Sequence, residues 1–245
     1  MMESKKLDSL NIEGLGTYAG GEFDRVNISG KGTITGDLKC QTLDISGLSK
    51  IQGQVACENM RVSGCGKLEH NIVADDIEVS GTLKCLKCLD AKSLYISGMS
   101  TIKQCLKANK VNVSGMLTVD GEMTCEEVKI DGMLNCECFL NCERLEISCV
   151  GTSKLNEVGA AEIVVKASAS KIPNIFGFLV PKVFRENKVI ANVIEGDEIT
   201  LENCQVKVVR GRNVRIGVNC QIETLEYSGE VQIHESSKIA QINQI

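Results

Sequence analysis

The sequence is poor in the residues from which nucleic-acid surfaces and catalytic centres are commonly built. It has no tryptophan, three tyrosines and five phenylalanines, so few aromatic rings could stack on bases. Its net charge of -5 provides no basic excess of the kind that a phosphate backbone attracts. We therefore do not expect nucleic acid as a partner.

Long apolar runs are also missing. The N-terminal stretch MMESKKLDSL has no apolar run of signal-peptide length, and no segment reaches the roughly 18 to 20 apolar residues needed to cross a bilayer. We therefore expect a cytoplasmic protein. In a reducing compartment its 13 cysteines would be small apolar side chains or metal ligands rather than a disulfide framework.

What the sequence does contain is a five-residue word that returns at a constant interval. Its first residues are Val26, Leu43, Met60, Ile77, Leu94, Val111, Val128 and Leu145. Counted from the start of each word, apolar residues recur at offsets 0, 2, 8, 12 and 14, an alternation that is typical of short strands rather than helices. Glycine recurs at offset 4, where a tight corner can require a positive φ.

One such unit cannot bury its own apolar face, so consecutive units must stack. The repeat therefore predicts an all-β parallel β-helix, a solenoid with about 17 residues in each coil. We expect a flexible N-terminus at 1–8 and a main β-helix at 9–165, which ends with a strand through Ile163 and Val165. Further coils are expected at 189–245, where three apolar pairs repeat the same interval: Val208 and Leu225, Val214 and Val231, and Ile222 and Ile239.

Residues 166–188 interrupt the repeat with an apolar segment of a different kind. This segment holds both prolines of the chain and the apolar residues Phe176, Phe178, Leu179 and Phe184. It is too short to span a membrane. It could cover the end of the first stack, or it could dock on a lipid surface or a protein partner.

The positions of the cysteines favour packing over metal binding. Offset 14 holds only small residues, including Cys40, Cys57, Cys125 and Cys142, as a narrow interior corner requires. Cys85 and Cys136 fall in the apolar column at offset 8. Cys88 and Cys105 lie at the outward offset 11, as neighbours on adjacent coils. The C-x2-C spacing of Cys85 and Cys88 resembles part of a zinc ligand set. One of these two sulfurs would point into the core, however, so we predict no metal and no cofactor.

The candidate catalytic residues do not assemble into a recognisable enzyme site. His70 and His234 have no obvious partner in the sequence, and an outward histidine in a coil is most simply a solvated side chain. The acids Asp75, Asp76, Glu126 and Glu127 fall at coil corners, where charge is solvated. The glycines recur with the coil and do not form a phosphate-binding motif. We therefore do not expect an enzyme.

Contact with other chains is the remaining possibility. A β-helix ends in open strand edges that must be capped or will pair. Leu10 and Ile12 begin the array with no capping helix before them, so we expect end-to-end association, unless residues 1–8 fold over the first coil. A further apolar column at offset 5, which includes Met99, Met116 and Met133, could turn into the core or serve lateral packing.

The repeated strand words, together with the segment VIEGDEITLENCQVKVVRGRNVRIG at 193–217, resemble the bactofilins, in particular the longer form of Gram-positive bacteria. This resemblance implies a right-handed β-helix that polymerises without nucleotide by joining coil ends. It also implies a cytoskeletal scaffold for cell-shape, envelope or motility proteins, with possible contact at the inner face of the membrane. No catalytic residue is implied. The alternative is a soluble β-helical adaptor that scaffolds partner proteins without polymerising.

Overall fold

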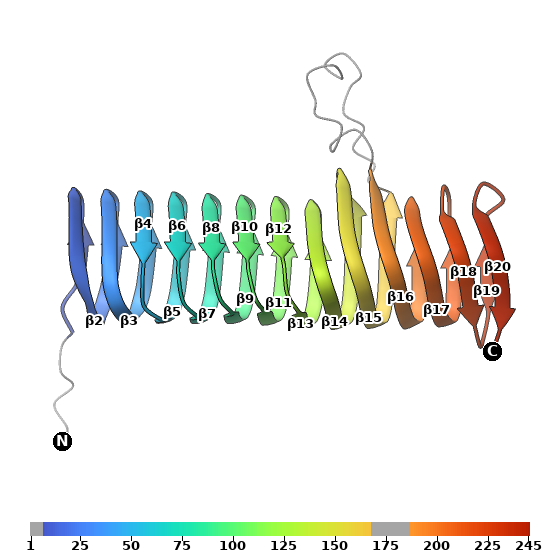
Figure 1. Cartoon of the computed structure of the whole chain (residues 1–245), viewed down its shortest axis with the longest axis horizontal. Helices are drawn as coiled ribbons and strands as arrows, with labels where there is room; N and C mark the ends of the chain where they lie inside the picture. Colours follow the sequence, from blue (N-terminus) through green and yellow to red (C-terminus); the bar gives the residue numbers. More distant parts are fainter. Residues whose placement is uncertain (1–6, 168–186) are drawn as a thin grey trace, which may run out of the picture. The chain divides into compact units, whose positions relative to one another are not determined.

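The computed structural model describes residues 7–167 and 187–245, and these residues form strands and turns without any helix. The chain divides into two compact units, Met1–Lys110 and Val111–Ile245. The boundary between them falls within strand β11 (Leu106–Val113). In both units consecutive strands pair in parallel with the coils before and after them, which confirms the predicted right-handed parallel β-helix (Figure 1).

Unit 1 repeats one coil with little variation. Its strands are β1 (Leu10–Ile12), β2 (Leu15–Ile28), β3 (Lys31–Ile45), β4 (Leu48–Ile51), β5 (Val55–Val62), β6 (Cys65–Leu68), β7 (Ile72–Val79), β8 (Thr82–Cys85), β9 (Leu89–Ile96) and β10 (Met99–Ile102), followed by the first part of β11. Leu38, Val55, Ile72 and Leu89 are successive register partners, each one coil after the last, and all four are buried. The apolar columns of the sequence are therefore the columns of the core.

The repeated glycines are required by close stacking rather than by backbone conformation. A Cβ atom on Gly47 would lie 2.0 Å from the carbonyl oxygen of Gly30, and one on Gly64 would lie 2.1 Å from that of Gly47. Positive φ angles are found instead at glycines outside this column, such as Gly36. The expectation of a positive φ at offset 4 was therefore wrong, because each corner lies directly against the corner of the neighbouring coil.

Unit 2 begins with the last part of β11 and keeps the parallel stacking with a less regular coil. Its other strands are β12 (Met116–Val119), β13 (Met123–Ile130), β14 (Met133–Cys149), β15 (Thr152–Ala167), β16 (Lys188–Leu201), β17 (Cys204–Ile216), β18 (Gln221–Tyr227), β19 (Val231–Ile233) and β20 (Lys238–Gln244). A register shift between Cys136 and Phe139 lengthens the coil from β14 to β15. Ile163 and Val165 are buried in β15, as predicted.

The C-terminal coils stack directly on the coil that precedes the 168–186 segment. Strands β15 and β16 pair in parallel from Thr152 with Lys188 to Val165 with Leu201. The predicted pairs Val214 with Val231 and Ile222 with Ile239 are confirmed. The pair Val208 with Leu225 was wrong, because this coil is shorter than the regular repeat and aligns Leu225 with Val209.

Candidate functional site

The last coil of unit 2 leaves exposed the apolar side chains whose equivalents are buried in the coil before it. In β18, Leu225 is fully buried, whereas its register partner Ile242 in β20 is 49% exposed. In the same way Ile216 is 1% exposed and its partner Ile233 is 40% exposed. Among the described residues, no strand pairs with the second edge of β20. The last coil therefore presents both apolar side chains and unpaired backbone groups to solvent.

The apolar residues of β1, in the first coil of unit 1, are less exposed than Ile233 and Ile242. Strand β1 pairs with β2 through Leu10 with Val26 and Ile12 with Ile28. Ile12 is fully buried and Leu10 is half-buried. The prediction that these two residues contact another chain stays a prediction. Ile233 and Ile242 were not among the sequence-predicted contacts.

The column at offset 5 behaves differently in the two units. In unit 1, Leu48 and Met99 are 53% and 54% exposed, so the interpretation of the column as core is wrong there. In unit 2, Met133 is buried and Met116 is half-buried. Met99 is thus exposed in unit 1 and Met133 is covered in unit 2, and lateral packing through the exposed residues of this column stays a prediction.

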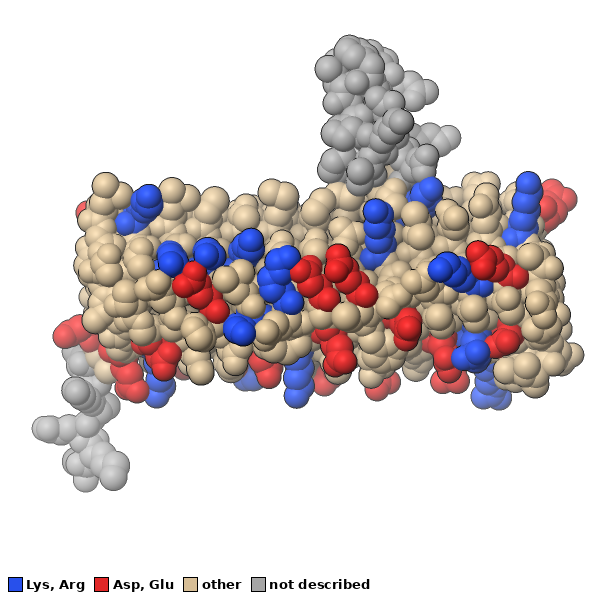
Figure 2. Space-filling view, viewed as in Figure 1, with Lys and Arg blue, Asp and Glu red and all other residues tan. Residues whose placement is uncertain are grey.

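A ladder of lysines lies beside this exposed column in unit 1. Lys50 in β4, Lys67 in β6 and Lys84 in β8 are successive register partners. The carboxylate of Glu69 lies 2.8 Å from the Lys67 amine and 3.4 Å from that of Lys50. The hydrogen bond from Lys67, with the charge of Lys50, lowers the pKa of Glu69. Figure 2 shows basic side chains following one another over part of the visible face, with acidic ones beside them.

This side of unit 1 is basic although the whole chain is acidic. Its coils contribute the segments 31–37, 48–54, 65–71, 82–88 and 99–105, which together carry six lysines and two acidic residues. The side chains at offsets 5 and 7 of the short strands point to the same face, because residues two apart on a strand lie on one side. Aliphatic and ammonium groups are therefore interleaved on it.

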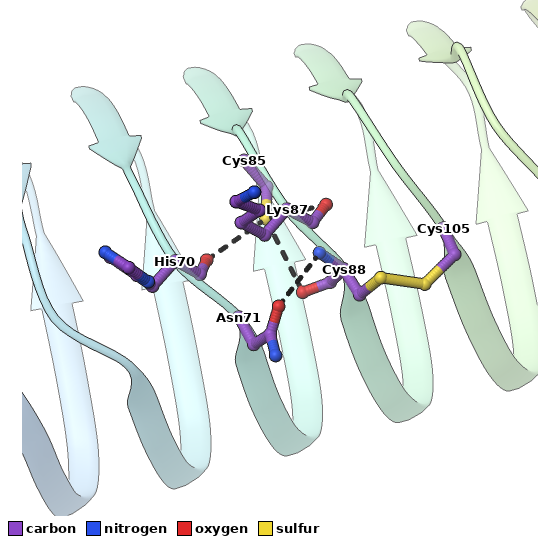
Figure 3. The surroundings of a disulfide bond; sticks show 6 residues. All are labelled: His70, Asn71, Cys85, Lys87, Cys88 and Cys105. Atoms are coloured by element: carbon purple, nitrogen blue, oxygen red, sulfur yellow. Dashed lines mark hydrogen bonds between the residues drawn. A yellow bond between two sulfur atoms is a disulfide. The ribbon is translucent and has the colours of Figure 1, made fainter.

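A disulfide joins Cys88 and Cys105 on neighbouring coils (Figure 3). The Cα atoms are 4.5 Å apart, and the backbone N–H of Cys88 donates to Asn71 Oδ1 at 3.3 Å. The sequence placed these cysteines correctly as neighbours but did not predict the bond. Parallel stacking brings equivalent residues within bonding range whatever their sequence separation, so one disulfide is present although a disulfide framework was not expected.

The thiol of Cys85 lies close to the disulfide, and it is buried as predicted (Figure 3). Its sulfur lies 3.5 Å from the carbonyl oxygen of Lys87 and 3.6 Å from those of His70 and Cys88. Burial raises the pKa of the Cys85 thiol, and the contact with the Lys87 carbonyl opposes this rise only in part. Cys85 is therefore a neutral packing residue that caps backbone carbonyls.

The predicted interior cysteines of the corner column are also in place. Cys40, Cys125 and Cys142 are buried, and Cys57 is half-buried. Burial raises the pKa of Cys142 to about 12. Among the described residues, no group of three or more His, Cys, Asp or Glu side chains is arranged to hold a metal ion.

The two histidines are exposed, as predicted. The ring of His234 has a partner after all, because its Nδ1 lies 2.9 Å from Ser236 Oγ and accepts a hydrogen bond from the Ser236 backbone at 3.2 Å. Both contacts are made within one turn between β19 and β20. They hold the imidazole against the turn and do not bring a second titratable side chain to it.

A shallow depression of about 680 Å³ lies on one face of unit 2. Its floor is formed by small residues, including Gly196 and Gly211, which are register partners. Arg210 at its rim donates to Glu226 at 2.8 Å and to Glu195 at 3.2 Å, and these hydrogen bonds raise the pKa of the arginine. Arg210 is thus shared between two carboxylates in an ion-pair network rather than being part of an acid–base pair.

The predicted contact residues Phe176, Phe178, Leu179 and Phe184 lie outside the described residues, as does most of the 166–188 segment. The same holds for most of the predicted flexible N-terminus, residues 1–8. In the described part of the chain, no helix has the length and apolarity required to cross a bilayer.

The chain is similar to two proteins of Bacillus subtilis (strain 168). It is 38% identical over 87 residues to the uncharacterized protein YhbF and 34% identical over 89 residues to the uncharacterized protein YhbE. Each match spans 36% of this chain and about a third of the relative, 33% and 35% respectively. No family model matches the chain. No solved structure matches it either.

Proposed function

We propose that this protein is a structural, nucleotide-independent polymer-forming protein that associates with copies of itself through the ends of its coils. The observation that carries the proposal is the contrast between Leu225, which the next coil buries completely, and Ile242, which has the same place in the last coil and is half exposed. A second copy stacked on β20 would bury Ile242 and Ile233 and would satisfy the backbone groups of the open edge.

The resemblance to bactofilins supports the same proposal. It implies polymers that scaffold cell-shape, envelope or motility proteins in a bacterial cytoplasm. The names of the two Bacillus relatives assign no activity to them, so they neither add to this function nor oppose it.

Electron microscopy of the purified, reduced protein tests the proposal. The full chain is examined without nucleotide or metal, over a range of salt concentrations. We expect filaments or sheets whose thickness is that of one coil. Discrete particles under every condition would contradict polymerisation and would favour the alternative, a soluble adaptor that scaffolds partners.

A pair of matched variants locates the contact. Ile242→Lys places a charge on the exposed apolar end, and desolvating this charge in an interface is costly, so we expect short or discrete particles. Gln241→Lys adds the same charge to the same strand on its other, exposed face, and we expect normal polymers. Equal assembly of both variants would show that β20 is not the contact.

A second candidate function, peripheral contact with an anionic membrane, is favoured by the basic side of unit 1. The ladder of Lys50, Lys67 and Lys84 would face lipid phosphates, and the exposed side chains of Leu48 and Met99 would enter the headgroup region. Each lysine near an anionic surface contributes roughly 1 kcal/mol. Stacked coils repeat these lysines along a row, so a polymer would multiply the contact.

Flotation of the protein with vesicles tests this contact. We expect binding to vesicles that contain phosphatidylglycerol, weaker binding at high salt, and none to phosphatidylcholine alone. Lys84→Glu should reduce binding several-fold, whereas Lys107→Glu, an exposed lysine on another side of the coil, should reduce it little. Similar losses in both variants would indicate a response to net charge and would contradict a specific face.

A further inference from the structure

Cys40 and Cys57 are stacked on neighbouring coils of unit 1, like the disulfide-bonded Cys88 and Cys105. They are Cα register partners in β3 and β5. Neighbouring parallel strands lie about 4.8 Å apart. This separation is within the range of about 4.4 to 6.8 Å between the Cα atoms of disulfides. The backbone therefore already holds the two cysteines at bonding range.

The two thiols are also in contact. The interaction with the Cys57 side chain lowers the pKa of Cys40 although burial opposes this effect, and the same interaction together with burial raises the pKa of Cys57. Cys40 is buried, but Cys57 is half-buried, so one sulfur of the pair is within reach of a small reagent from solvent. Cys204 and Cys220 in unit 2 make a similar thiol contact, yet both are buried. Solvent access to Cys57 therefore distinguishes the Cys40–Cys57 pair from the Cys204–Cys220 pair.

We propose that Cys40 and Cys57 are a second site of disulfide formation in unit 1, closed by exchange with a low-molecular-weight disulfide, RSSR. The Cys57 thiol loses its proton to solvent and its sulfur attacks one sulfur of the oxidant, the RS–SR bond breaks, and one RSH leaves after protonation. The Cys40 thiolate then attacks the Cys57 sulfur, the Cys40–Cys57 bond forms, and the second RSH leaves. Two protein thiols are oxidised and one RSSR is reduced to two RSH.

The result is two covalent cross-links, each of which joins two consecutive coils. Cys40–Cys57 links the coil of β3 to that of β5, and Cys88–Cys105 links two coils further along the same unit. Solenoid coils are held only by their neighbours, so a cross-link between neighbours restricts the opening of the stack at that point. Oxidation would therefore stiffen unit 1 at two places without changing its fold.

Peptide mapping tests the proposal directly. The full chain is reduced, equilibrated with mixtures of oxidised and reduced glutathione, quenched with acid, alkylated in denaturant and digested with trypsin. Cys40 and Cys57 fall in separate peptides, 40–50 and 51–61, and neither peptide contains another cysteine. We expect a linked 40–50/51–61 peptide in the monomer band of a non-reducing gel, together with the linked peptides 88–92 and 104–107.

Two variants define the outcome. Cys57→Ser should abolish the linked 40–50/51–61 peptide and leave the Cys88–Cys105 link in place. Cys65→Ser, which removes an exposed cysteine of the same unit, should leave both links. The proposal is overturned if Cys40 and Cys57 are recovered as separate alkylated peptides, or as a persistent glutathione adduct, at a ratio that closes Cys88–Cys105. It is overturned equally if the link appears only between two chains.

Discussion

Ile242 is the register partner of Leu225, and although the two side chains occupy the same core column, Leu225 is fully buried and Ile242 is half exposed. In protein kept as discrete particles, Leu225→Ala should lower the free energy of unfolding by about 2 to 5 kcal/mol, because it leaves a cavity. Ile242→Ala should lower it by only about 1 kcal/mol. Urea unfolding measures both free energies. Equal losses in the two variants would contradict the exposure of Ile242 at an uncovered end of the core.

Close stacking of the glycine corner predicts an unequal response to two alanine substitutions. A Cβ at Gly64 would meet the Gly47 carbonyl at 2.1 Å, whereas a Cβ at Gly14 would meet nothing within 4 Å. Gly64→Ala should therefore lower the free energy of unfolding by about 1 to 3 kcal/mol or more. Gly14→Ala should leave it nearly unchanged. Thermal unfolding of the two variants compares them, and similar melting temperatures would refute the stacking constraint.

The Cys88–Cys105 disulfide should contribute measurably to the stability of unit 1. It closes a loop with a sequence separation of 17, for which chain entropy predicts about 3 kcal/mol. In a Cys57→Ser background, reduction with dithiothreitol should lower the free energy of unfolding by that amount. The further change Cys88→Ser should reproduce the loss and make the protein insensitive to the reductant. A persistent effect of the reductant would assign the stabilisation to another pair.

Stability should decrease at high pH, because burial raises thiol pKa values. The folded pKa of Cys142 is about 12, and the ordinary thiol value is 9.0. The unfolded state therefore loses its proton first, so the contribution of Cys142 is complete below pH 9 and is lost as the pH rises toward 12. Cys142→Ala should flatten the fall in stability above pH 9. An unchanged slope in urea titrations would show that the thiol ionises freely in the folded protein.

Two buried serines should respond to alanine in opposite directions. The Ser100 hydroxyl is buried and has no hydrogen-bond partner among the described residues, whereas Ser153 Oγ accepts the backbone N–H of Leu134 at 3.0 Å. Ser100→Ala should raise the free energy of unfolding by about 1 kcal/mol, because it removes an unsatisfied polar group. Ser153→Ala should lower it by about 1 to 3 kcal/mol, because an amide loses its partner. Chemical unfolding of both variants shows whether each substitution raises or lowers the free energy of unfolding.

The position of the glycines shows where sequence reasoning reached the right residue for an incomplete reason. The regular return of Gly30, Gly47 and Gly64 located the coil corners correctly. A single sequence cannot distinguish a glycine needed for its φ angle from one needed for its missing side chain. The distinction depends on the carbonyl of the neighbouring coil, which is a full coil away in the chain and in direct contact in space.

The C-terminal coils show a limit of a different kind. A strictly constant interval placed Ile222 with Ile239 correctly but paired Val208 with the wrong residue. Coils in unit 2 differ in length by a residue or more, and a shift of one residue turns a side chain from the core to the surface. Only the observed register separates the two cases.

By itself, the sequence determined the fold class, the coil length and most of the core. Apolar residues recur at the same offsets in each coil, and the equivalent residues of the neighbouring coils bury them. The tertiary structure alone decided what is exposed or joined between coils: the open apolar end at Ile242, the outward Met99, and the bond between Cys88 and Cys105. These features arise from contacts between equivalent positions on adjacent coils. A period in the sequence shows that such positions stack, and only the packed structure shows which side chain is covered, which is left open, and which meets a partner that it can bond.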